Sequence, residues 1–168
     1  MIYTCAEAAK LLRSLNEELM IRRRKEQKSI LFTASIDEDL EAARPPYDYR
    51  DEQQKQEELE QKIRTVKHAI NTFNLNTVIP EFGITIDEML VYIPQLSEQK
   101  RKLTEMAACL PKERVNGGSN INRKVEYTYT NYSPEEARED LQKVTDELAK
   151  CQLALDRING SAVIELKI

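Results

Sequence analysis

The aliphatic side chains of this chain recur at alternating steps of four and three residues along four segments, and this rhythm constrains the fold most strongly. Such steps average about 3.5 residues per turn, the period of a coiled-coil seam, which predicts amphipathic helices crossing at shallow angles. The stripes are Ala8, Leu12, Leu15 and Leu19; Leu59, Ile63, Val66, Ile70 and Phe73; Met89, Ile93, Leu96, Leu103, Ala107 and Leu110; and Ala137, Leu141, Val144, Leu148, Cys151, Leu155 and Ile158. A stripe this narrow can be buried within one chain, as a bundle or as helical hairpins, or between chains; we favour hairpins with an additional homo-oligomeric contact.

Local signals indicate where these helices begin and end. Thr4 with Glu7, and Thr85 with Glu88, have the S/T-x-x-E spacing of a capping box, in which each side chain satisfies a free amide of the other's turn. We expect helices over about 4–30, 48–75, 85–110 and 133–159, the last beginning with an N-cap serine and a first-turn proline. Pro94 lies inside the third helix and predicts a kink.

Two stretches between the helices do not follow the helical pattern. Pro45 and Pro46 force extended backbone, so we expect a mobile loop at about 33–48, with a short strand possible over Ile30–Ala34. A turn is expected at 112–123, around Gly117 and Gly118.

Two short segments have the alternation of β-strands. Residues 124–130 alternate β-prone side chains strictly, with Tyr127 and Tyr129 on one face, and residues 162–168 resemble a final strand. We expect these two segments to form a small accessory β element and to pair with each other. The predicted fold is therefore mainly α, with four long helices, in a single domain over 1–168, a size that can bury its own core.

Charge and composition limit the cellular compartments and the binding partners that we expect. The net charge of −4 argues against general nucleic-acid binding, and no apolar run approaches the roughly 18–20 residues of a membrane span. The N-terminal residues lack the basic and apolar regions of a secretion signal. Cys5, Cys109 and Cys151 are an odd number without CxxC spacing, which favours reduced thiols in the cytoplasm.

The sequence lacks the residue motifs that are typical of an enzyme active site. His68 is the single histidine and is expected on a helix surface, and no HExxH, CxxC or phosphate-loop motif is present. Cys151 falls on the fourth stripe, where a free cysteine acts as a small buried hydrophobe. We therefore predict no catalytic residue, no metal site and no cofactor.

Two sets of residues are candidates for ligand binding. Arg22, Arg23 and Arg24, with Lys28, could hold a phosphate, or could simply complement the dipole at a solvated helix end. Tyr127 and Tyr129 could stack on a ligand, or could cover the core beside a small sheet. If the two sets met across a subunit boundary, they would fit a small anionic aromatic molecule such as a nucleotide.

The order of these features resembles a family of small bacterial and phage-borne helical proteins labelled septicolysin-like. The matching stretches are Ala6–Ala8, Ile70–Asn74 and Thr85–Leu90, together with a final long helix ending at Asn159. The chain departs from the family at Ile93-Pro94, where the family carries Arg-Asp, and at Asn159-Gly160, where it carries Asn-Trp. The resemblance implies a helical fold of unestablished activity and a bacterial or phage source.

Taken together, the residues lead to two hypotheses. The first is a non-enzymatic, cytoplasmic assembly or interaction protein that forms homo-oligomers through its helical seams. The alternative is a sequestering protein for a small anionic ligand, which would use Arg22–Arg24 and the tyrosines. Neither hypothesis requires a membrane or a nucleic acid.

Overall fold

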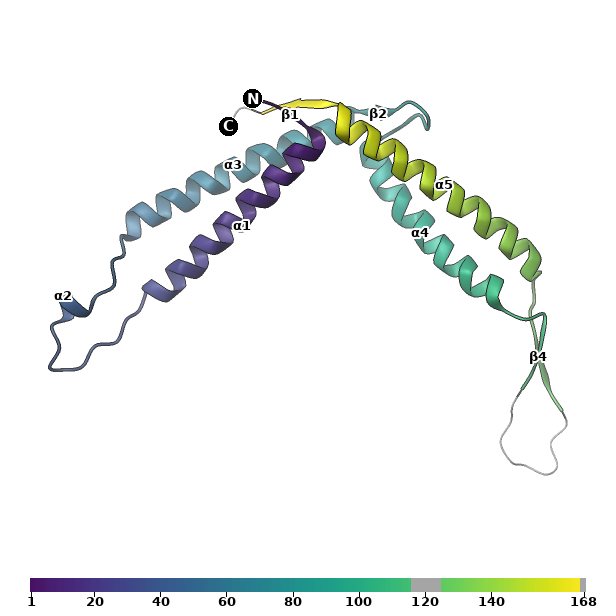
Figure 1. The fold of residues 1–168 in the computed structure, drawn as a ribbon, viewed down its shortest axis with the longest axis horizontal. Helices are drawn as coiled ribbons and strands as arrows, with labels where there is room; N and C mark the ends of the chain where they lie inside the picture. The colour runs from purple at the N-terminus through teal and green to yellow at the C-terminus, as the bar shows by residue number, and fades with distance from the viewer. Residues whose placement is uncertain (116–124, 167–168) are drawn as a thin grey trace. The chain divides into compact units, whose positions relative to one another are not determined.

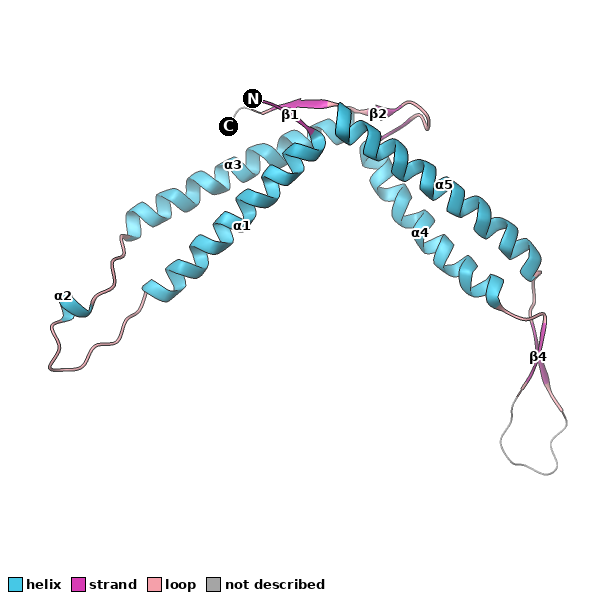
Figure 2. Cartoon of the chain, in the orientation of Figure 1, coloured by secondary structure: helices cyan, strands magenta, loops and turns pink. Residues whose placement is uncertain are grey.

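The structure, a computed structural model, describes residues 1–115 and 125–166. It is mainly α, with small antiparallel sheets of two strands, as the sequence predicts (Figure 2). The chain separates into two compact units, one of Met1–Thr77 with Arg157–Ile168 and one of Val78–Asp156. This division was not part of the prediction, which treated 1–168 as one helical domain.

The first unit is built on two long helices, α1 (Cys5–Ser29) and α3 (Tyr49–Asn76), which pack against each other (Figure 1). Thr4 caps α1 with the predicted capping box, since its hydroxyl accepts from the Glu7 amide at 3.2 Å and its own amide donates to the Glu7 carboxylate at 2.8 Å. The connection between the helices carries a short helix, α2 (Leu40–Ala43). Residues 30–34 form no strand, so the possible strand there is wrong.

A two-stranded sheet closes the first unit beside the chain ends. Strand β1 (Ile2–Thr4) pairs antiparallel with β6 (Val163–Glu165), with Tyr3 opposite Ile164. The N-terminal ammonium donates to the Leu166 carbonyl oxygen at 2.8 Å. The buried core beneath this sheet consists of Cys5, Ala8, Val66, Ile164 and Leu166.

The second unit contains a β-hairpin followed by two further long helices. Strands β2 (Val78–Ile79) and β3 (Ile84–Thr85) pair around a turn in which Gly83 has φ +68°. Thr85 then caps α4 (Ile86–Ala108) through the second predicted capping box, and Pro94 lies inside this helix. Helix α5 (Pro134–Ser161) ends two residues beyond the predicted Asn159.

Helices α4 and α5 each bury residues of the predicted stripes. Leu148 and Cys151 of α5 are buried, as are Met89 and Leu96 of α4. Burial raises the pKa of Tyr92 in α4, and the charges of Glu147 and Cys151 of α5 raise it further. The prediction that Cys151 packs in a core is confirmed.

The predicted pairing of the two β segments is wrong. Strand β5 (Tyr127–Tyr129) pairs with β4 (Lys112–Arg114), whereas β6 pairs with β1. Strands β4 and β5 form a local hairpin, for which loop closure costs little entropy, whereas β6 pairs with β1 at the other end of the chain. Residues 116–124 and 167–168, which include parts of the predicted turn and strands, lie outside the described residues.

Candidate functional site

The seam of the first unit changes from apolar to polar toward the connection between α1 and α3. Near the chain ends Ala8 and Val66 are completely buried. Toward the connection, polar side chains of α1 meet the first turns of α3, which the sequence shows to be free of apolar residues over Arg50–Glu58. This polar stretch of α3 therefore has a partner within the chain, and its partner is α1.

Glu26 is the centre of this polar contact. Its carboxylate accepts hydrogen bonds from the Tyr47 hydroxyl, from Gln53 Nε2 and from Gln56 Nε2, each at 2.7 Å. These donors, Tyr47 first, lower the pKa of Glu26, and the same bond raises the pKa of Tyr47 to about 12. Gln56 is itself buried. The network ties the connection and the start of α3 to the end of α1.

Two of the predicted ligand residues already have carboxylate partners. Arg22 lies 3.5 Å from Glu18 and 3.5 Å from Glu52, and Arg23 Nη2 lies 2.6 Å from Glu60. A shallow pocket of about 220 Å³ is lined by Glu18, Ile21, Arg22, Lys25 and Glu52. Its two cations and two carboxylates balance, so an anion entering here competes with glutamate for the arginine.

The other two predicted basic residues are differently placed. Arg24 and Lys28 are exposed, and neither has an ion-pair partner within the described part of the chain. Lys28 lies in the last turn of α1, where a cation complements the negative end of the helix dipole. The four predicted basic residues therefore do not form one converging anion site.

The connection between α1 and α3 exposes large apolar side chains, which we call the apolar connection: Ile30, Leu31, Phe32, Ile36 and Leu40. Leu31 is 82% exposed and Ile36 is fully exposed. Sequence reasoning treated this stretch as a loop and missed it as a surface. The signal was present in the run Ile30–Phe32, which we interpreted as a possible strand.

Side-chain contacts hold the apolar connection in shape. The Ser35 amide donates to the Glu38 carboxylate at 2.7 Å, and Asp39 caps α2 by accepting from the Glu41 amide at 3.0 Å. The Arg44 guanidinium lies 5.9 Å from the centre of the Phe32 ring. The segment before α2 and the segment after it are thus in contact, while the large apolar side chains of the connection remain exposed to solvent.

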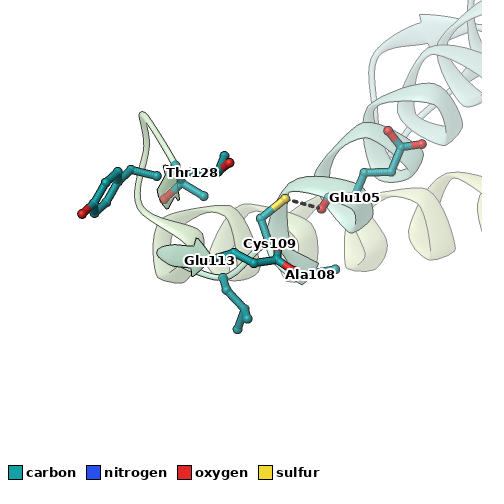
Figure 3. A pocket seen from close by; sticks show the side chains of 8 residues that line it. Glu105, Ala108, Cys109, Glu113 and Thr128 are labelled. Atoms are coloured by element: carbon teal, nitrogen blue, oxygen red, sulfur yellow. Dashed lines mark hydrogen bonds between the residues drawn. The ribbon is translucent and has the colours of Figure 1, made fainter. Parts of the chain in front are cut away.

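A second pocket, of about 410 Å³, lies where α4 meets the β4–β5 hairpin. Figure 3 shows Cys109 beside Glu105, whose backbone carbonyl oxygen accepts from the thiol at 3.4 Å. The Tyr132 hydroxyl donates to the Met106 carbonyl oxygen at 2.9 Å and fixes the chain at the end of α4. Among the described residues, no group of three His, Cys, Asp or Glu side chains could hold a metal.

The predicted tyrosines lie on the β4–β5 hairpin. Tyr127 and Tyr129 share one face with ring centres 6.4 Å apart, and both rings are exposed, so they contribute little to a core. Lys112 Nζ lies 4.0 Å from the centre of the Tyr127 ring and 5.5 Å from that of Tyr129. The arginines belong to the first unit and the tyrosines to the second, so the predicted ligand set is divided between the units.

The architecture defines a class, a mainly α protein of paired long helices with short antiparallel strands at their ends. It is similar to the crystal structure of a functionally unknown conserved protein from Corynebacterium diphtheriae, with a TM-score of 0.65 and 16% sequence identity. The similarity covers 98% of this chain and 100% of that chain. No family model matches the chain, and no curated protein is significantly similar to it.

The helices are also informative about membranes. Within the described residues, none of them is both long enough and apolar enough to cross a bilayer.

His68 is exposed on α3, which confirms its predicted place on a helix surface.

Proposed function

We propose that this chain is a non-enzymatic assembly protein that forms homo-oligomers, and that the apolar connection is its principal docking surface. The observation that carries the proposal is the exposure of five large apolar side chains within residues 30–40. Single exposed apolar residues are ordinary, whereas a contiguous group of them is typical of an interaction site.

The energetics support docking at this place. Burying one such side chain fully contributes about 1.5–3 kcal/mol, so even partial burial of the group would offset much of the cost of association. The contacts of Glu38, Asp39 and Arg44 order the connection in advance, which reduces the entropy lost when it binds.

Light scattering coupled to size-exclusion chromatography tests this function directly. The wild-type protein is expected to show a mass that rises with concentration toward a multiple of 19.5 kDa. Leu31→Ser together with Ile36→Ser is expected to lower that mass, because both side chains are exposed and their replacement leaves the fold intact.

Leu153→Ser is the matched control, since Leu153 is also exposed but lies on α5. It is expected to leave the mass unchanged. A wild-type protein that stays monomeric over a hundredfold range of concentration would contradict self-assembly.

A second candidate function is the binding of a small anionic ligand at the pocket beside Arg22 and Lys25. It is favoured by one observation: the Arg22 Nε donor is buried and makes no hydrogen bond to any described residue. A thermal-shift screen with inorganic phosphate and with nucleotides tests it, because a ligand that binds the native state raises the melting temperature. An increase that persists in Arg22→Gln would contradict this site.

The compartment that we propose is the cytoplasm. Cys5, Cys109 and Cys151 are all free thiols, which fits a reducing environment. Cell fractionation with an antibody to the chain checks this proposal. A bacterial or phage source, implied by the septicolysin-like resemblance, stays a prediction.

A further inference from the structure

We infer that the apolar connection docks onto a second copy of itself in a two-fold arrangement, with acidic residues of each copy on basic residues of the other. The inference rests on the proposed self-assembly and names its geometry. Two charged sets flank the apolar run Ile30–Phe32 along the chain. They are the basic end of α1, Arg24, Lys25 and Lys28, and the acidic turn, Asp37, Glu38 and Asp39.

The order of these surfaces along the hairpin carries the inference. The basic end belongs to the last turns of α1, the run Ile30–Phe32 follows, and the acidic turn comes just before α2. Figure 1 shows that the connection extends beyond the ends of α1 and α3, with α2 near its far end. From the end of α1 to the start of α2 the chain therefore runs from positive charge, through the apolar run Ile30–Phe32, to negative charge.

This order of surfaces is complementary to the same order in a second copy that runs in the opposite direction. A two-fold axis through the apolar run superposes the run of one copy on that of the other and places each acidic turn on the partner's basic end. Every contact then occurs twice, as in the isologous interfaces typical of dimers. A head-to-tail arrangement would satisfy only one acidic turn and one basic end per pair of molecules.

The charges are available for this contact. None of the six residues of the two surfaces has an ion-pair partner within the described part of the chain. The carboxylates of Glu38 and Asp39 accept backbone amide hydrogen bonds, which orient them without neutralising them. By contrast Arg22 and Arg23, immediately before Arg24, are already paired with glutamates.

Charge reversal tests the geometry. One variant carries Asp37→Lys and Glu38→Gln, since glutamine keeps an oxygen acceptor for the Ser35 amide, and keeps Asp39 as the cap of α2. The other variant carries Arg24→Glu and Lys28→Glu. Each variant alone places like charges opposite each other, so its self-association constant is expected to fall about tenfold or more at low salt. An equimolar mixture restores opposite charges at both contacts, so its association is expected to return to the wild-type level.

Sedimentation velocity measures the association of each variant and of the mixture, and circular dichroism checks that helix content is unchanged. Lys10→Glu with Arg13→Glu, at the opposite end of α1, is the matched control and is expected to associate like the wild type. Two results would overturn the geometry and leave self-assembly standing. In the first, both variants associate as tightly as the wild type. In the second, the mixture associates no more tightly than either variant alone. A monomeric wild type would overturn both and leave the apolar connection to a different protein.

Discussion

Helix α5 of the second hairpin buries apolar residues along most of its length, whereas the α1–α3 hairpin replaces apolar contacts by hydrogen bonds and ion pairs toward the connection. In α5 the buried residues recur from Pro134 to Ala154. In the first hairpin the completely buried pair Ala8 and Val66 gives way, toward the connection, to Glu26 with its three donors.

The difference shows what each kind of seam contributes. An apolar seam stabilises through burial and tolerates small shifts between helices, because dispersion contacts have little directionality. A hydrogen-bonded network is satisfied in only one alignment, and a partner left unsatisfied is costly. We infer that the polar seam fixes the register of α1 on α3 and so fixes the apolar connection beyond it.

The largest expected effect is the loss of a core side chain in the second hairpin. Leu148→Ala removes three carbon atoms from a buried position and is expected to destabilise the protein by about 3 kcal/mol. The melting temperature should fall by about 10 °C in differential scanning calorimetry. Leu153→Ala, at an exposed position on the same helix, should change stability by less than about 0.5 kcal/mol. Equal effects at the two positions would mean that the α5 stripe is not the buried face.

A smaller effect is expected from the polar seam of the first hairpin. Gln56→Ala removes a buried donor to Glu26 and is expected to cost about 1–2 kcal/mol in urea denaturation. Gln56→Leu keeps the volume, so it isolates the hydrogen bond from the packing. Gln54→Ala, an exposed neighbour, serves as the control. A Gln56→Leu protein as stable as the wild type would show that the polar seam contributes nothing to stability.

The two capping boxes offer a matched pair, one in each hairpin. Thr4→Ala and Thr85→Ala each remove a hydroxyl that accepts from a backbone amide, and each is expected to cost about 1 kcal/mol. Hydrogen exchange should speed up at the start of α1 in the first variant and at the start of α4 in the second. Faster exchange in both helices of either variant would show that the hairpins unfold together.

The smallest change is expected on acidification, because Glu26 is reached by solvent and its interactions are screened. The folded state lowers the pKa of Glu26 below its ordinary value of 4.5. Its contribution to stability is therefore present above about pH 4.5 and is lost as the pH falls through the lower, folded value.

Glu26→Gln tests this in acid denaturation followed by circular dichroism. The variant should lose less stability than the wild type between neutral pH and pH 3, since it has no carboxylate to protonate at this position. Glu57→Gln, at an exposed position on α3, should follow the wild type. Identical acid profiles for Glu26→Gln and the wild type would show that Glu26 does not contribute to the pH dependence of stability.

Much of the helical structure was predictable because its causes are local. The capping threonines Thr4 and Thr85 and the spacing of aliphatic residues act within one or two turns, so the sequence alone places α1, α3, α4 and α5 to within a few residues. The alternation at Tyr127–Tyr129 likewise marked a strand. His68 on the surface and Cys151 in a core followed from the same periodicity.

Only the tertiary structure decided which segments meet. Alternation of side chains gives no information about which strand is the partner. We therefore predicted that residues 124–130 pair with 162–168, whereas β5 pairs with β4 and β6 pairs with β1. Arg22 and Arg23 resemble an anion site in the sequence, but Glu52 and Glu60, thirty or more residues further along the chain, already neutralise them. The periodicity of a helix records which face is apolar, whereas contacts between distant residues depend on how the chain closes on itself.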